Sequence, residues 1–372
     1  MKKLLKIIGT VLAMIVLCSV GAAFGILLSL SLFSGLFNGV EIIIGIAGIL
    51  LSLYISIIIH EGGHLVFGLL SGYGFSSFRI ANFMWIKQEG KIRFRRLSIT
   101  GTGGQCLMTP PEEKNGKTPV VLYNLGGVIA NILLSVIFGL SCFLIGELNL
   151  IGLMLFFGAI LSFVMALSNG IPMNVGGIAN DGMNALHLSK DRVATAAFVN
   201  QLRMNAEQAK GIRISRMPDE WFELPEGADM QNVMCASIAV FSASRTLDRL
   251  DTEAAEREVE ALLDSDYNII GLHKNLLKCD LVFSRLINHG KQAEISSLLG
   301  MEQLKFMKSM KSYPSVLRTE YAIALIRDND LQKAESIMAD FEKMAKKYPY
   351  PSDIESDREL CALALEKYKK DI

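Results

Sequence analysis

The chain has 372 residues, and 51% of them are hydrophobic, a larger share than an ordinary soluble domain carries. Its 37 basic and 37 acidic side chains balance to a formal net charge of zero, so global electrostatics indicates no nucleic-acid partner. The six cysteines are scattered, without the short spacing of a metal knuckle or a redox motif, and no disulfide framework is expected.

Four segments in the first half of the chain are long and apolar enough to cross a bilayer as helices, which takes ~20 residues. They cover residues 7–33, 41–68, 119–145 and 150–171. The first follows Lys2, Lys3 and Lys6 and is longer than the apolar core of a cleaved signal peptide, which is the alternative interpretation. It is therefore predicted to be a signal-anchor helix.

The links between these segments differ in charge. The link from about residue 72 to 118 holds many Lys and Arg residues, whereas the two short links contain Glu41 and Glu147 and no basic residue. The positive-inside rule therefore predicts a multi-pass protein of the cell membrane, with the middle link and both termini in the cytosol.

Residues 78–95 of the middle link partly alternate apolar and polar side chains around a turn at Gln88-Glu89-Gly90, which predicts a small cytosolic β-hairpin. A glycine-rich stretch, 101–104, follows it. Two interpretations stay open. The hairpin either only connects two helices, or it offers an edge that pairs with an extended substrate backbone.

Residues 185–372 have the composition of a charged, soluble sequence and are predicted to be all-helical. Turns at Asn288-His289-Gly290 and Asp328-Asn329-Asp330 separate amphipathic stretches, and the units recur every ~38–41 residues. This spacing fits stacked helical hairpins similar to divergent tetratricopeptide repeats, and a plain helical bundle is the alternative.

The second apolar segment ends with His60-Glu61-Gly62-Gly63-His64. Two histidines four residues apart lie on one face of a helix, so their imidazoles can bind one Zn²⁺ with Glu61 beside the metal. Ionisable groups at the centre of a spanning helix cost roughly 2.5–3.5 kcal/mol each, so they indicate a functional site. The alternative is that these residues lie solvated and inert at the cytosolic end of the helix.

A catalytic zinc site needs a third protein ligand. The fourth apolar segment ends near Asn169 and Pro172, and Asp181 follows on the membrane face where the predicted topology also places the two histidines. Asp181 alone also fits a turn residue or a helix N-cap, and His187 is a rival third ligand.

Residues 45–186 resemble the site-2 protease family of intramembrane zinc metallopeptidases. The zinc motif at the end of an apolar helix is similar to that of the family. Leu125–Asn131 looks like its Gly-Pro-Leu-Ala-Asn stretch, with Gly127 where proline is usual. Asn169, Pro172 and Asp181-Gly182 look like its Asn-x-x-Pro and Asp-Gly motif, although the gap between the two parts is longer here.

The resemblance implies that His60, His64 and Asp181 bind zinc with water as the fourth ligand. It implies that Glu61 is the general base and that Asn169 holds the substrate backbone or the oxyanion. The family's membrane-associated β segment would correspond to the hairpin and the glycines after it. No PDZ-sized domain fits into the middle link, so substrate selection would use another part, such as the C-terminal helical domain.

The sequence thus predicts an all-α membrane protein with about four transmembrane helices and a small cytosolic β-hairpin. Residues 1–184 would form a transmembrane metallopeptidase domain, and residues 185–372 a cytosolic helical domain that binds a protein partner. The expected activity is zinc-dependent endoproteolysis of membrane-embedded or membrane-proximal polypeptides, in regulated intramembrane proteolysis or in the processing of signal or pheromone peptides.

Two alternatives to this activity stay open. One is a catalytically inactive membrane scaffold or immunity-type protein that retains the fold. The other is a zinc peptidase of another membrane class, which needs a glutamate as third ligand. No glutamate in the fourth segment or at its cytosolic end fills that role.

Overall fold

The computed structural model describes residues 21–22, 25–26, 29–30, 35, 37–99, 102–113, 118–146, 149–175 and 178–370. The predicted first spanning helix, 7–33, lies largely outside these residues, as do Gly101, Gly176 and Gly177. The chain divides into two compact units, one of residues 1–75 with 102–191 and one of residues 76–101 with 192–372. The division predicted between residues 184 and 185 stays a prediction.

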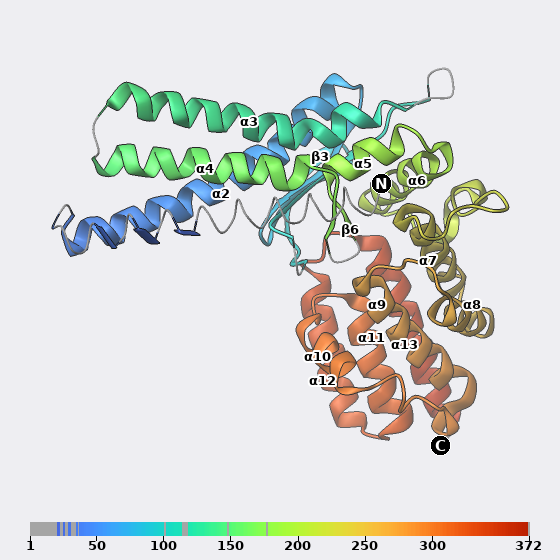
Figure 1. Ribbon diagram of the computed structural model, residues 1–372. Helices are drawn as coiled ribbons and strands as arrows, with labels where there is room; N and C mark the ends of the chain where they lie inside the picture. Colours follow the sequence, from blue (N-terminus) through green and yellow to red (C-terminus); the bar gives the residue numbers. More distant parts are fainter. Residues whose placement is uncertain are drawn as a thin grey trace. The chain divides into compact units, whose positions relative to one another are not determined.

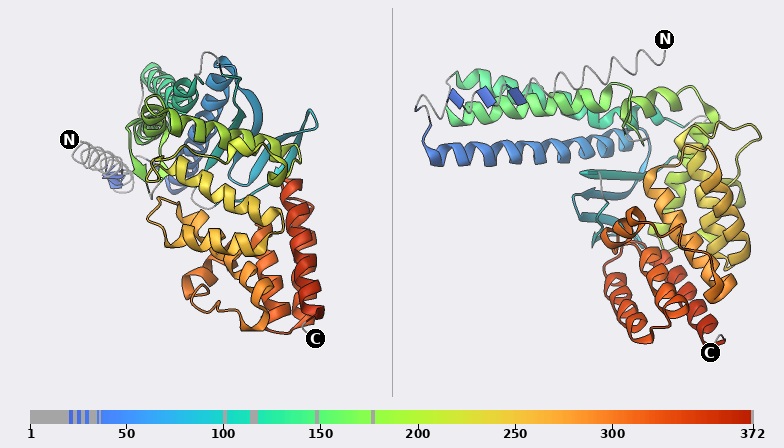
Figure 2. Two further views of the ribbon diagram at one scale, coloured as in Figure 1. Left: turned by 90° about the vertical axis from the view of Figure 1, so that its right-hand side faces the viewer. Right: turned by 60° about the horizontal axis from the view of Figure 1, so that its bottom comes forward.

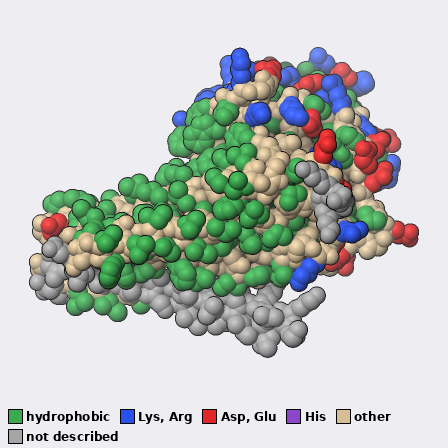
Figure 3. Space-filling model, turned by 90° about the horizontal axis from the view of Figure 1, so that it is seen from above, with side chains coloured by type: hydrophobic (Ala, Val, Ile, Leu, Met, Phe, Trp, Pro, Cys, Tyr) green, Lys and Arg blue, Asp and Glu red, His purple; other side chains and the backbone are tan. Residues whose placement is uncertain are grey.

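Three long helices form most of the first unit: α2 (Gly39–Leu70), α3 (Val120–Ile145) and α4 (Leu150–Gly170). They run side by side in every view (Figures 1 and 2). Each is long and apolar enough to cross a membrane. Their exposed side chains are almost all hydrophobic, whereas charged side chains gather over the other unit (Figure 3). The second, third and fourth predicted spanning helices are therefore confirmed as apolar helices of that length.

Polar residues at the helix ends explain where α2 begins. Asn38 accepts hydrogen bonds from the backbone N–H groups of Val40 and Glu41, and the Glu41 carboxylate accepts one of 2.7 Å from the Asn38 N–H. This reciprocal arrangement is a capping box, which satisfies backbone donors that a helix leaves unpaired at its first turn. It starts the helix at residue 39.

Small residues on α2 let the three helices approach closely. Gly45, Gly48, Ser52 and Ser56 are buried along one face. A Cβ atom at Gly48 would lie 1.7 Å from the Cε atom of Met154 on α4. The hydroxyl groups of Ser56 and Ser162 are 2.7 Å apart and join α2 to α4. Small side chains and buried hydroxyl pairs of this kind hold helices together in lipid, where the hydrophobic effect between helices is weak.

The middle link forms a four-stranded sheet in the order β3-β2-β1-β4. Its strands are β1 (Gly74–Ile80), β2 (Phe83–Gln88), β3 (Lys91–Arg96) and β4 (Gly104–Thr109). The predicted hairpin corresponds to β2 and β3, in which Trp85 is opposite Phe94. Glu89 and Gly90 between them have φ angles of 50° and 77°, as the tight turns of hairpins require. The element is therefore larger than the predicted hairpin.

The remaining described part of the second unit is helical, as expected. Its α-helices are α6 (Arg192–Ala209), α7 (Val233–Asp248), α8 (Thr252–Asp264), α9 (Gly271–His289), α10 (Met301–Ser309), α11 (Pro314–Ala322), α12 (Leu331–Ala345) and α13 (Pro351–Lys370). Neighbours such as α7 and α8, α8 and α9, and α11 and α12 pack against one another (Figure 2). Whether these helices are tetratricopeptide-like repeats or a bundle stays a prediction.

Hairpin residues belong to the core of this helical unit. Met84 and Ile86 on β2 are fully buried and lie in one cluster with Leu317 and Phe341. The Gln88 side-chain amide donates a hydrogen bond of 2.8 Å to the carbonyl oxygen of residue 349. One face of the hairpin is therefore covered by helices that follow it in sequence by more than a hundred residues.

Candidate metal centre

The two histidines of α2 and one carboxylate converge on a single point. The Nε2 atoms of His60 and His64 are 3.3 Å apart. The Oδ2 atom of Asp181, the first residue of α5 (Asp181–Leu188), lies 3.0 Å from the first of them and 3.4 Å from the second. Within the described parts of the chain, this is the only group of His, Cys, Asp or Glu side chains arranged to hold a metal ion. The three predicted ligands are thus brought together, and their binding of zinc stays a prediction.

Asp181 is held in place by its neighbour Asn180, which is the N-cap of α5. The Asn180 side chain makes four hydrogen bonds of 2.6–3.0 Å with backbone groups, from the N–H groups of Met173 and Met183 and to the carbonyl oxygens of Ser168 and Ile171. These bonds join the end of α4, the following loop and the start of α5. The N-cap is therefore Asn180, and the alternative of Asp181 as N-cap is wrong.

Gly182 explains how α5 can begin so close to α4. A Cβ atom at this position would lie 2.1 Å from the carbonyl oxygen of Gly170, so only glycine permits the approach. Burial alone would raise the pKa of the Asp181 carboxyl, but the hydrogen bonds with His60 and His64 outweigh burial and hold the pKa at about 2. The carboxylate is therefore ionised, as a metal ligand must be.

The remaining ring nitrogens of the two histidines have partners that suit a metal site. His64 Nδ1 is 2.9 Å from the carbonyl oxygen of Tyr123, to which it can only donate. His60 Nδ1 is 3.2 Å from the side-chain amide of Asn131 on α3, and Asn131 Oδ1 is buried without a hydrogen-bond partner among the described residues. Rotating this amide by half a turn lets Oδ1 accept a hydrogen bond from the Nδ1–H group of His60. With both Nδ1 atoms protonated, the two Nε2 atoms can bind one Zn²⁺ in place of their hydrogen bonds with Asp181.

Two glycines let strand β4 and helix α3 approach the side chains of the histidine motif closely. A Cβ atom at Gly104 on β4 would lie 2.5 Å from Cγ of Glu61, which is buried on α2. A Cβ atom at Gly127 on α3 would lie 2.6 Å from Cε1 of His60. The ring of His60 therefore occupies the space that any side chain at position 127 would need.

Two other residues considered from the sequence do not belong to this ligand group among the described residues. Asn169 donates a hydrogen bond of 2.9 Å from its amide to the carbonyl oxygen of Met165, one turn earlier on α4, and its role toward a substrate stays a prediction. His187, the rival ligand, is exposed and does not belong to the metal-ligand group among the described residues.

Sequence reasoning assigned no role to Asn131 and Asn180. Asn131 is a fully buried amide in an apolar helix, and such a residue needs a polar partner, which was the available signal. Asn180 precedes an amphipathic stretch, and asparagine at that position is a common N-cap.

Comparison with known proteins agrees with this geometry. The family model of peptidase family M50 matches residues 48–311, more than half of the chain, and this stretch contains His60, Glu61, His64 and Asp181. Searches of curated proteins and of solved structures returned no match. The chain belongs to peptidase family M50, the site-2 protease family, and has the fold of a membrane metallopeptidase.

Proposed function

We propose that the protein is a zinc-dependent endopeptidase that cleaves membrane-embedded or membrane-proximal polypeptides. The observation that carries the proposal is the convergence of His60, His64 and Asp181 within a group of apolar helices, with ligand atoms all within 4.8 Å of one another. Three protein ligands leave one position for water, as catalytic zinc sites do.

The chain's own residues would divide the reaction between them. Bound zinc would supply Lewis acidity, which acidifies a water molecule and polarises the scissile carbonyl group. Glu61, which lies in the helical turn between the two histidines, would accept the proton of the attacking water and pass it to the leaving amine nitrogen. Asn169 would orient the substrate backbone through its amide. Asn131 and Asn180 are positioning residues, because they act through His60 and Asp181.

The sheet supports an extended conformation for the substrate. Strand order places β4 at one edge, and Gly104 on β4 packs against the Glu61 side chain. A polypeptide that pairs with this edge would be held as a strand, and helical substrates must unwind before their carbonyl groups can be attacked. This favours the interpretation of the middle link as a substrate-binding edge.

The orientation in the membrane follows from charge. The basic residues of the middle link and of the N-terminus would lie in the cytosol, together with the helical unit. Water must reach the zinc, which favours a site near the cytosolic face. Membrane-bound regulators and signal or pheromone peptides are the substrate classes that suit such a site.

The test uses the protein purified in detergent, with bound zinc measured by mass spectrometry and cleavage measured on a reporter membrane polypeptide. Glu61→Gln should retain zinc and lose cleavage, because the amide cannot accept the proton. Asp181→Ala should lose both zinc and cleavage. Glu113→Gln, at an exposed glutamate of the same unit, is the matched control and should behave as the wild type.

The outcomes separate the alternatives. Cleavage by Glu61→Gln at the wild-type rate would show that Glu61 is not the base. Wild-type protein that binds zinc and leaves the reporter intact would favour the inactive scaffold or immunity-type protein, in which the zinc is structural.

A further inference from the structure

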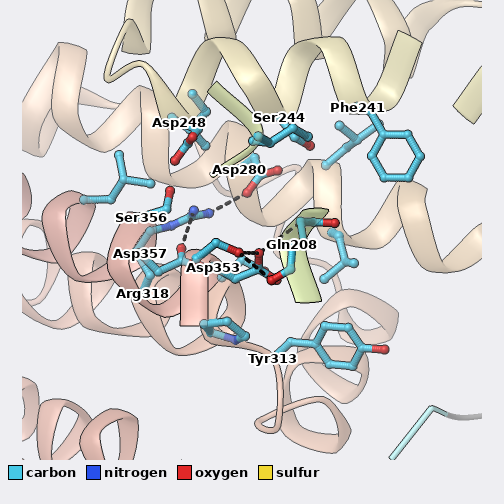
Figure 4. A pocket seen from close by; sticks show the side chains of 18 of the residues that line it. Gln208, Phe241, Ser244, Asp248, Asp280, Tyr313, Arg318, Asp353, Ser356 and Asp357 are labelled. Atoms are coloured by element: carbon cyan, nitrogen blue, oxygen red, sulfur yellow. Dashed lines mark hydrogen bonds and ion pairs between the residues drawn. The ribbon is translucent and has the colours of Figure 1, made fainter. Parts of the chain in front are cut away.

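A cavity of about 240 Å³ lies inside the helical unit, between α6, α7, α9, α11 and α13 (Figure 4). Its walls combine apolar side chains, among them Phe241, Leu276 and Leu277, with several carboxylates. None of the residues of the metal centre lines it. The mechanism above gives these carboxylates no role.

Two of the carboxylates share one cation. Arg318 is buried and donates hydrogen bonds to Asp280 and, at 2.7 Å, to Asp357. Figure 4 shows this guanidinium between the two acids. One positive charge therefore balances two negative charges, and this side of the cavity keeps an excess negative charge.

The negative charge of a third carboxylate, Asp248, is balanced by an arginine that does not line the cavity. Arg213 lies 2.8 Å from its Oδ1 atom, and the backbone N–H of Ser215 lies 2.9 Å from its Oδ2 atom. The same Arg213 also contacts Glu359 at 2.8 Å, so its charge is shared as well. Arg213 therefore has no positive charge left to balance Asp280, Asp353 or Asp357.

The fourth carboxylate, Asp353, has only neutral partners. Its Oδ1 atom accepts a hydrogen bond of 3.0 Å from the Gln208 amide, and its Oδ2 atom lies 3.4 Å from the Tyr348 hydroxyl. No Lys, Arg or His nitrogen of the described residues lies within 4.0 Å of it. Burial, and then the charge of Asp357, raise the pKa of Asp353 to about 7. A cationic ligand would relieve this cost.

A histidine of the cavity wall also lacks a partner. The Nδ1 atom of His273 is shielded from solvent and has no hydrogen-bond partner in the described part of the chain. Burial lowers the pKa of His273 to about 4, so the ring is neutral and adds no positive charge. It stands edge-on to Phe241, with ring centroids 5.9 Å apart. A neutral imidazole can accept a hydrogen bond from a donor-rich ligand.

The spacing of these carboxylates argues against a metal ion as the ligand. Within the described residues, only His60, His64 and Asp181 bring three metal-ligating atoms within 4.8 Å of one another. No three carboxylates of the cavity therefore come close enough to one another to surround a metal ion. An anion is excluded by the four carboxylates in the lining against one guanidinium.

We propose that this cavity binds an ammonium or guanidinium group on an aliphatic stem, carried by a basic side chain of a polypeptide or by a free polyamine. The charged head reaches Asp353 and faces the Asp357 carboxylate, and the stem packs along the apolar wall, as Lys and Arg stems do on apolar surfaces. The aromatic face of Phe241 favours a cation further. This site is separate from the proposed peptidase activity and does not depend on it.

The experiment is a calorimetric titration of the full chain in detergent at pH 8. The probes are the capped tripeptides acetyl-Gly-Lys-Gly-amide and acetyl-Gly-Arg-Gly-amide, their norleucine counterpart, and spermidine. We expect binding of at least one cationic probe and none of norleucine, which has the stem without the charge. Asp353→Asn should weaken binding at least tenfold. Asp264→Asn, at an exposed aspartate of α8, is the matched control and should leave it unchanged.

A second variant supplies the cavity with a cationic side chain of the protein itself. Ser244→Lys places an ammonium group from α7 into the lining, so we expect it to abolish binding of the probes and to raise the melting temperature. Binding of the tripeptides indicates a polypeptide as the source of the cation, and binding of spermidine alone indicates a free polyamine. The proposal is overturned if no cationic probe binds, if norleucine binds equally well, or if Asp353→Asn binds as the wild type does.

Discussion

Asp181 and Asp353 are both largely shielded from water, yet their surroundings have opposite effects. Two imidazoles lie within 3.4 Å of Asp181 and keep the pKa of its carboxyl at about 2. Asp353 has hydrogen bonds from neutral groups only, and its pKa is raised to about 7. Burial raises the pKa of both carboxyls, so the nature of the partners decides the sign of the shift. The surroundings of Asp181 stabilise its negative charge, whereas those of Asp353 contain no positive charge to balance it.

The largest effect is expected where the metal centre has no spare space. Gly127→Ala adds a Cβ atom that would lie 2.6 Å from Cε1 of His60, so the ring must move and zinc binding should be lost. Displacement of a catalytic group by about 1 Å lowers activity by about a hundredfold, and we expect at least that loss. Zinc content and the rate of reporter cleavage measure it. Gly139→Ala on the same helix, where a Cβ atom meets nothing within 4 Å, is the control. Equal behaviour of the two variants would contradict the geometry.

A smaller effect is expected from the amide that orients His60. Asn131→Leu removes the acceptor for His60 Nδ1 and keeps the branching and number of side-chain heavy atoms, and loss of such a partner lowers metal affinity by about 10–100-fold. Asn131→Asp keeps an oxygen acceptor and should retain zinc. Competition with a chelator measures both affinities. If the two variants lose zinc equally, Asn131 acts through packing and the inferred proton position on His60 is wrong.

The smallest effect concerns the second carboxylate. The folded-state pKa of Asp353, about 7, lies above its unfolded value of about 4, so ionisation costs folding stability progressively as pH rises through this interval. Asp353→Asn removes that cost and should raise the melting temperature at pH 8 by roughly 2–4 °C. At pH 4 the two proteins should melt alike. Thermal unfolding of the full chain at both pH values measures it, and a variant less stable at pH 8 would show that the carboxylate is already balanced by a cation.

The metal centre was largely predictable because its signals are local. His60 and His64 are separated by one helical turn, and the topology predicted from the sequence puts Asp181 on the same side of the membrane. Their roles in zinc binding stay predictions. The positioning role of Asn180 was not predicted, because four of its bonds depend on the path of the loop between α4 and α5.

The sheet and the cavity depend on contacts between distant residues, which local patterns do not reveal. The alternation over residues 78–95 predicts a hairpin, but strand order depends on long-range pairing, so a four-stranded sheet with β4 beside β1 was not foreseen. The cavity joins Gln208 to Asp353, 145 residues apart, through a hydrogen bond that no spacing rule suggests.

The burial of Met84 and Ile86 among the helices that follow residue 192 limits how the protein can be divided. A chain truncated at residue 191 would keep β2 and lose Leu317 and Phe341, the side chains that cover it. Two large apolar side chains on a strand would then face water, which makes such a fragment prone to aggregation. The helices after residue 192 therefore cannot be removed without exposing strand β2, which precedes them by more than a hundred residues.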